Sequence, residues 1–140
     1  MSSPADPVPG AITVAADLKQ VRDLAAWLRE RCVAEGIVDM IAFELELALV
    51  EAANNCVEHG YAPGEEGRIG LDFTVGGGEA RVLLYDRGRP LPENALGSPG
   101  DVPCTATSGR GIGIVIACTN GVEYRSENGL NRLTMRKLLF

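Results

Sequence analysis

One stretch near the middle of the sequence, Glu51-Ala-Ala-Asn-Asn-Cys-Val-Glu-His-Gly-Tyr61, combines polar side chains with an apolar helical pattern. Glu51 and Asn55 are four residues apart, so in a helix both point from the same side. An amide oxygen there suits a hydrated Mg²⁺, and a nearby carboxylate can accept a proton. The alternative is an exposed helix face on which Glu and Asn have no chemical role, and the spacing alone favours that alternative.

This stretch ends the second of two amphipathic helices that the sequence predicts. The first helix begins after a capping residue, Asp17, and ends at Gly36. The second begins near Asp39 and ends at Gly60. Apolar residues recur at helical spacing in both, which predicts a buried stripe on each. These residues are Leu18, Val21, Leu24, Ala25, Leu28 and Cys32 in the first helix, and Ile41, Leu45, Ala48, Leu49, Ala52 and Cys56 in the second.

Five segments are typical of strands, and a third helix is predicted from Ile112 to about Thr119. Alternating apolar and polar residues precede a triple-glycine turn at 76–78, and a Glu-Asn-Gly turn at 127–129 joins the last two strands. The order of elements indicates an α+β two-layer sandwich, with helices on one face of a mixed, mostly antiparallel sheet. The five strands are expected at 11–15, 69–75, 80–85, 122–126 and 130–138.

A second candidate for function is Asp86-Arg-Gly88, where an apolar strand ends. A carboxylate at this position can accept a hydrogen bond from an exocyclic amine, such as that of adenine, in an otherwise apolar pocket. Gly88 would let a base approach the backbone closely. A loop that simply begins with Asp-x-Gly is the alternative.

A third candidate is the glycine-rich segment Ser108-Gly109-Arg110-Gly111-Ile112. Its glycines permit a tight turn, and the free N–H groups at a helix start suit phosphate oxygens, with Arg110 adding a positive charge. A flexible hinge into a helix is an equally good interpretation. The preceding segment, from Arg87 to Thr107, is rich in proline and glycine and is typical of a lid over a binding site.

Length and composition limit the function further. The 140 residues suffice for one domain, expected at 11–140 after a disordered tail at 1–10. A net charge of −6 and the lack of a basic run argue against direct nucleic-acid binding. Neither a signal peptide nor a membrane span is predicted. The four cysteines form no C-x-x-C pair and there is one histidine, so we expect reduced thiols, no zinc site and a cytoplasmic location.

Together, the helix with Glu-x-x-x-Asn, the strand ending in Asp-x-Gly, the lid and the Gly-x-Gly helix start resemble the GHKL superfamily of ATP-binding domains. The resemblance covers residues 40 to 138, and the short domain with its stretch 51–61 looks most like the anti-sigma-factor serine/threonine kinases of stress response and sporulation. Family members often continue to Asp-x-Gly-x-Gly, whereas Pro90 stands at the last position here. The glycine turn can be aligned on Gly109-x-Gly111 or on Gly111-x-Gly113, and we prefer the first.

The resemblance implies a role for each motif. Asn55 is expected to bind Mg²⁺, Glu51 to act as the general base, and Asp86 to recognise adenine. Nucleotide contacts are implied for Gly88, Ser108, Gly109, Arg110, Gly111 and Ile112. The implied activity is ATP-dependent phosphorylation of an anti-sigma-factor antagonist by a homodimer that also sequesters a sigma factor. A binding module that needs ATP but transfers nothing, or a GHKL-type ATPase, is the alternative.

Overall fold

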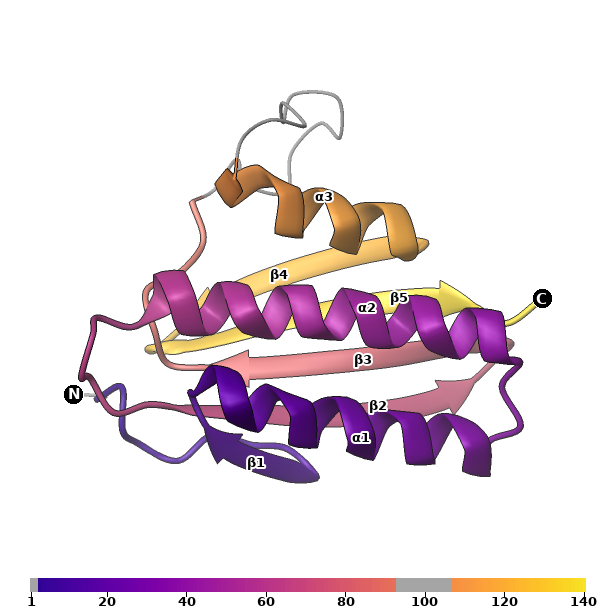
Figure 1. The fold of residues 1–140 in the computed structure, drawn as a ribbon, viewed down its shortest axis with the longest axis horizontal. Helices are drawn as coiled ribbons and strands as arrows, with labels where there is room; N and C mark the ends of the chain where they lie inside the picture. Colours follow the sequence, from indigo (N-terminus) through magenta and orange to yellow (C-terminus); the bar gives the residue numbers. More distant parts are fainter. Residues whose placement is uncertain (1–2, 93–106) are drawn as a thin grey trace.

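The structure, a computed structural model, describes residues 3–92 and 107–140. Its elements follow the order that the sequence predicted, with a five-stranded sheet and three α-helices (Figure 1). None of the described helices is long and apolar enough to cross a bilayer. The elements are β1 (Ile12–Ala15), α1 (Leu18–Ala34), α2 (Asp39–Asn55), the π-helical turn η1 (Cys56–Gly60), β2 (Arg68–Gly76), β3 (Glu79–Asp86), α3 (Thr107–Cys118), β4 (Gly121–Glu127) and β5 (Leu130–Leu138).

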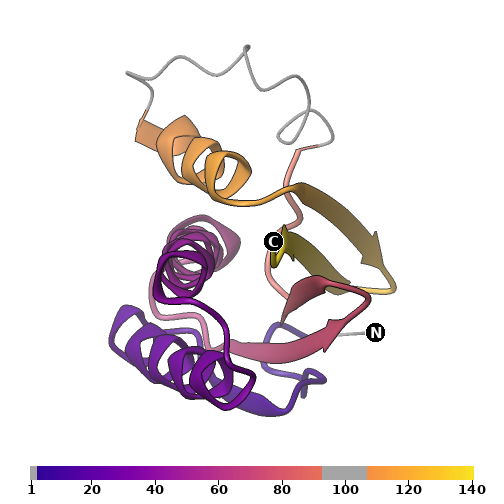
Figure 2. The same ribbon diagram turned by 90° about the vertical axis from the view of Figure 1, so that its right-hand side faces the viewer.

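The strands lie in the order β1-β2-β3-β5-β4, and each of the four pairings is antiparallel. The α+β sandwich is therefore confirmed, although the described strands contain no parallel pair and the sheet is not mixed. Short hairpin turns join β2 to β3 and β4 to β5, and short connections of this kind produce antiparallel neighbours. Figure 2 shows all three helices on one side of the sheet, so no helix of the described residues covers the opposite face.

The predicted start and end signals of α1 are confirmed. The Asp17 carboxylate accepts a hydrogen bond from the Lys19 amide at 2.8 Å and so caps the helix. Gly36 follows the last turn with φ of +70°, a conformation that glycine adopts without steric cost. The hairpin turns also have positive φ at both central residues, Gly77 with Gly78 and Asn128 with Gly129, as expected for two-residue hairpins.

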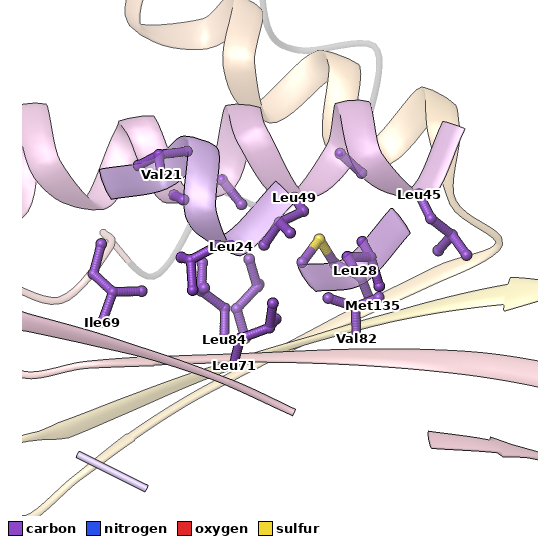
Figure 3. Packing of buried hydrophobic residues seen from close by; sticks show 14 of the residues in the cluster. Val21, Leu24, Leu28, Leu45, Leu49, Ile69, Leu71, Val82, Leu84 and Met135 are labelled. Carbon is purple, nitrogen blue, oxygen red and sulfur yellow. The ribbon is translucent and has the colours of Figure 1, made fainter. Parts of the chain in front are cut away.

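A single apolar core fills the space between the helices and the sheet (Figure 3). Leucines from α1 and α2 meet side chains from alternate positions of β2, β3 and β5, because alternate residues of a strand face the same side. The predicted stripes of both helices are largely confirmed, except that Leu18 is exposed. The largest fully buried side chains include Leu24, Leu28, Leu45, Leu49, Ile69, Leu71, Val82, Leu84 and Met135.

The N-terminal segment differs from its expected disorder. Val8 is buried, and the Pro9 carbonyl lies so close to Gly70 that a Cβ there would sit 1.8 Å from its oxygen. The segment therefore runs along β2, and Gly70 leaves the space that it occupies. Its proline-rich composition suggested disorder because the sequence gives no sign of this long-range contact.

Candidate functional site

Glu51 and Asn55 lie one turn apart near the C-terminal end of α2, on one side of the helix as predicted. Both side chains are half-buried. Among the described residues, neither side chain forms a hydrogen bond or an ion pair with another. Carboxylate and amide oxygens of this kind suit Mg²⁺, and binding of the ion here stays a prediction.

The predicted second helix changes geometry directly after Asn55. Residues Cys56–Gly60 form the π-helical turn η1, a wider turn that is rare and often occurs at functional sites. The Cys56 thiol donates a hydrogen bond to Asp86 Oδ2 at 3.3 Å. This contact joins the end of α2 to the end of β3, so the two motifs that are 30 residues apart in sequence lie together.

Asp86 is the last residue of β3 and is 6 % exposed. Its Oδ1 accepts hydrogen bonds from the Gly88 amide at 2.9 Å and from Asn131 Nδ2 at 2.8 Å. A buried carboxylate costs free energy unless donors surround it, and these donors hold it in one orientation. Oδ2 has only the weak thiol donor among the described residues, so it keeps the capacity to accept from an amine.

Burial, together with the charge of Asp86 and the hydrogen bond to it, raises the pKa of the Cys56 thiol well above its usual value. The thiol therefore stays protonated at neutral pH and can donate its hydrogen bond to Asp86. Cys56 is thus a hydrogen-bond donor to the carboxylate rather than a reactive thiolate.

Gly88 lies against the π-helical turn. A Cβ on Gly88 would sit 2.6 Å from the Gly60 carbonyl oxygen, and the Arg89 amide donates to that same oxygen at 2.7 Å. The requirement for glycine is therefore explained by the backbone of η1. Close approach of a base, which the sequence suggested, remains a prediction.

Tyr61 holds the same corner together. Its hydroxyl donates to the Arg68 carbonyl at 3.2 Å and accepts from the Arg87 amide at 3.0 Å. Burial is the main cause that raises the pKa of Tyr61 to about 12, so the hydroxyl keeps its proton at neutral pH. The end of η1, the start of β2 and the end of β3 are thereby fixed to one another.

The glycine-rich segment is placed differently from the prediction. α3 begins at Thr107, so Ser108, Gly109, Arg110 and Gly111 belong to its first turns instead of forming a turn before Ile112. Glycine is a poor helix residue but is tolerated where neighbouring residues continue the helix. The first four N–H groups of a helix have no partner within it, so this segment still offers amide donors. Its nucleotide contacts stay a prediction.

Ile112 is buried, and Val115 one turn later belongs to the core. α3 packs against α2, which carries Glu51 and Asn55. Of the predicted lid, residues 93–106 lie outside the described residues. The structure thus brings together the C-terminal end of α2 and the end of β3. The glycine-rich segment belongs to α3, which is the helix packed beside α2 (Figure 1).

Sequence reasoning missed Asn131, which is 2 % exposed on β5 directly opposite Asp86. Its amide nitrogen also donates to the Gly88 carbonyl at 2.9 Å, and its oxygen accepts from Ser126 Oγ at 2.7 Å. The only signal in the sequence was an asparagine at a core-facing position of an alternating strand. Such a residue predicts a buried polar contact but does not identify the partner.

The fold agrees with the comparisons to known proteins. A family model described as the histidine kinase-like ATPase domain matches residues 14–137, and the chain belongs to this family. Its structure is similar to that of the RsbU and RsbW domains of Rv1364c from Mycobacterium tuberculosis. The identity is 21 %, the TM-score is 0.63, and 95 % of this chain and 33 % of that one are covered. This chain thus spans a third of the length of that solved chain.

Two histidine kinase structures are also similar. The kinase domain of the blue-light-activated histidine kinase from Erythrobacter litoralis has 15 % identity and a TM-score of 0.55, covering 96 % of this chain and 66 % of that one. The catalytic domain of the histidine kinase ThkA has 16 % identity and a TM-score of 0.57, covering 91 % of this chain and 96 % of that one. At these identities the likeness establishes the fold. No curated protein matches the chain significantly.

Proposed function

We propose that this chain is an ATP- and Mg²⁺-dependent serine/threonine protein kinase that phosphorylates an anti-sigma-factor antagonist and, as a homodimer, sequesters a sigma factor. The observation that carries the proposal is the contact between Cys56 and Asp86. It places the helix that bears Glu51 and Asn55 beside the carboxylate suited to adenine. In this proposal the candidates for binding the base, the metal and the incoming hydroxyl therefore lie at neighbouring element ends.

In this proposal Asn55 holds Mg²⁺ and Glu51 orients or deprotonates the substrate hydroxyl. Phosphoryl transfer needs mainly positioning and charge stabilisation, which the amide donors and Arg110 at the start of α3 would supply. Glu51 is the residue that favours catalysis over simple binding, because a general base is needed only where a nucleophile, such as a protein hydroxyl or water, is activated. The anti-sigma partner is proposed from the resemblance of the stretch 51–61 to the anti-sigma-factor kinases.

The histidine kinases with the same fold raise the question of autophosphorylation. The sequence has a single histidine, His59, which lies exposed in η1 inside the proposed nucleotide site. A histidine kinase needs a phosphoacceptor histidine outside that site. Within the 140 residues given, autophosphorylation would have to use His59, so identifying the labelled residue distinguishes it from transfer to a partner protein.

The test is to incubate the protein with labelled ATP, Mg²⁺ and the antagonist encoded nearest to it. We expect label on a serine or threonine of the antagonist. Tight binding of ATP and of the antagonist without transfer would instead establish a binding module, and release of phosphate without a labelled protein would establish an ATPase. Label retained on His59 would indicate autophosphorylation and would contradict the proposed transfer to a partner.

A further inference from the structure

The face of the sheet opposite the helices carries two arginine pairs that are directly opposed across neighbouring strands. Arg81 on β3 faces Arg136 on β5, and Arg125 on β4 faces Arg132 on β5. Directly opposed residues have Cβ atoms about 4.5–5.5 Å apart, and like charges in such pairs destabilise the sheet. An anion between the two arginines of a pair would relieve this repulsion.

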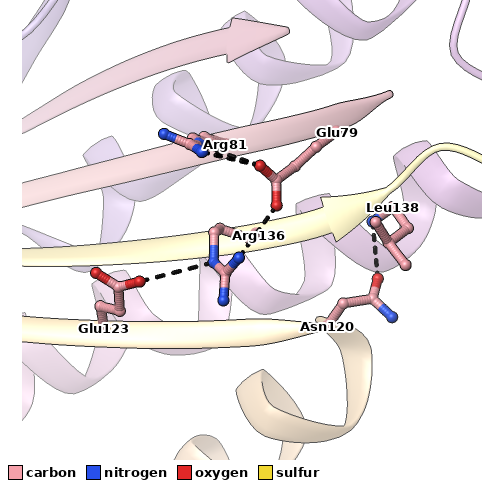
Figure 4. Close-up of polar contacts among 6 residues, drawn as sticks. All are labelled: Glu79, Arg81, Asn120, Glu123, Arg136 and Leu138. Atoms are coloured by element: carbon pink, nitrogen blue, oxygen red, sulfur yellow. Dashed lines mark hydrogen bonds and ion pairs between the residues drawn. The ribbon is translucent and has the colours of Figure 1, made fainter. Parts of the chain in front are cut away.

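The first pair has its anion within the chain. Glu79 lies between the two arginines, with Oε2 at 3.0 Å from Arg81 and Oε1 at 3.3 Å from Arg136, as Figure 4 shows. Glu123 adds a second carboxylate at 3.8 Å from Arg136 Nε. This pair is neutralised.

The second pair lacks an equivalent carboxylate among the described residues. Arg125 reaches only Glu127, at 3.9 Å, and the side chains of both residues are about 70 % exposed, so solvent screens this contact. Arg132 forms no ion pair or hydrogen bond with a described side chain. Arg87 lies nearby, and its Nε donates to the Pro7 carbonyl, which is uncharged.

These three arginines line one hollow of about 460 Å³, together with Glu127, Tyr85 and Leu130. Three guanidinium groups against one carboxylate give the hollow a formal charge of +2, in a chain whose net charge is −6. An acidic ligand is repelled by most of such a surface and attracted here.

We propose that this hollow docks an acidic peptide segment of a partner protein, with a partner carboxylate between Arg125 and Arg132 as Glu79 lies between Arg81 and Arg136. The cations come from three separate places, the end of β3 and the two strands of the β4–β5 hairpin. A segment with several carboxylates fits this spread better than a single small anion. Arginine also suits carboxylates because its planar group can donate two parallel hydrogen bonds.

The test measures fluorescence anisotropy of a labelled peptide of alternating glutamate and serine, without nucleotide, against the same peptide with glutamine for glutamate. We expect the wild-type chain to bind the acidic peptide selectively, and less tightly as salt is added. The double change Arg125→Gln with Arg132→Gln should weaken binding by about tenfold or more. Arg81→Gln is the matched control, because it makes the same substitution on the same face but in the neutralised pair. Its affinity for the acidic peptide should stay within about twofold of that of the wild-type chain.

Equal loss in the Arg81→Gln control, or equal binding of the two peptides, would overturn the proposal. Binding of inorganic phosphate in the hollow without binding of the acidic peptide would also overturn it. The arginines of the hollow are largely solvent-facing, so the variants should fold, and circular dichroism checks this. The assay needs neither ATP nor transfer, so its failure is distinct from failure of the proposed kinase activity.

Discussion

Asp86 and Asn131 lie directly opposite each other on β3 and β5 and are joined by a hydrogen bond of 2.8 Å from the amide nitrogen to the carboxylate. Both side chains are buried and face the helices. The same amide nitrogen also reaches the Gly88 carbonyl. One asparagine therefore fixes both the carboxylate and the loop that follows it.

Asn131→Ala should lower the free energy of unfolding by about 1–3 kcal/mol, because the buried Asp86 carboxylate loses one of its three donors and the Gly88 carbonyl loses its side-chain donor. ATP affinity should fall as well, since Asp86 loses its fixed orientation. Urea unfolding and calorimetry measure the two effects. Ser126→Ala is the comparison, because it removes the donor to the Asn131 oxygen but keeps the hydrogen bonds from Asn131 to Asp86 and Gly88, so ATP affinity should not change. Wild-type stability and ATP affinity in the Asn131 variant would contradict this role.

Asp86→Asn should weaken ATP binding by about 1–3 kcal/mol, the range for a charged hydrogen bond that is lost. The wild-type chain should prefer ATP to GTP, because guanine presents a carbonyl where adenine presents an amine. Calorimetry with both nucleotides tests this prediction. Asp72→Asn, whose side chain faces the other side of the sheet, should change neither affinity. Equal affinity of the wild type for ATP and GTP would show that Asp86 does not read the base.

Glu51→Ala and Asn55→Ala should fail in different ways. Loss of the Asn55 amide removes a magnesium ligand, so both Mg-ATP binding and transfer should be lost. Loss of the Glu51 carboxylate should leave ATP and sigma-factor binding intact while transfer falls about 10²–10⁴-fold. Single-turnover phosphorylation and a parallel binding measurement separate the two. Transfer at the wild-type rate in the Glu51 variant would show that another group acts as the base.

Two glycine substitutions should have opposite effects on stability. Gly88→Ala should destabilise the chain and weaken ATP binding, because its Cβ would meet backbone atoms of Gly60 that cannot move freely. Gly113 lies inside α3, and a Cβ on it would have no neighbouring atom within 4 Å, so Gly113→Ala should stabilise the helix by up to about 1 kcal/mol. Thermal unfolding and ATP titration test both. Loss of ATP binding in Gly113→Ala would favour the alternative glycine alignment on Gly111 and Gly113.

Stability should decrease at alkaline pH. Burial raises the pKa of the Cys32 thiol from 9.0 to about 11, with the charge of Glu46 as a smaller cause. The folded chain therefore holds this proton more tightly than the unfolded chain. The resulting stability is fully present below pH 9 and is lost as the pH rises toward 11. Urea unfolding across this range should show a shallower decline for Cys32→Ala, and an equal decline in both proteins would contradict the assignment.

The order of elements and most of the core could be predicted from the sequence, because both depend on local periodicity and on turn residues. Asp17, Gly36 and the two hairpin turns mark boundaries within one or two residues of where the structure places them. Two features could not be predicted in this way. The start of α3 was missed because glycines normally argue against a helix, and the packing of Val8 and Pro9 on β2 depends on contacts distant in sequence.

For the site, residue type and position suggested the chemistry of Glu51, Asn55 and Asp86. They did not indicate which residues hold Asp86 in place through hydrogen bonds. Cys56 was predicted as a small core residue, and Asn131 was not singled out. Both act through hydrogen bonds to Asp86, over 30 and 45 residues of sequence. A single sequence carries no signal for such pairings, because a buried polar residue indicates that it has a partner without saying which.

The alternation of side chains along β3 has a consequence for communication between the two faces of the sheet. Asp86 faces the helices, while its neighbours Tyr85 and Arg87 line the hollow on the other side. A ligand that moves the backbone at Tyr85 or Arg87 also moves Asp86, because only one peptide bond separates them. Thermodynamic linkage makes such an effect mutual: if nucleotide tightens the binding of a partner, that partner tightens the binding of nucleotide by the same factor.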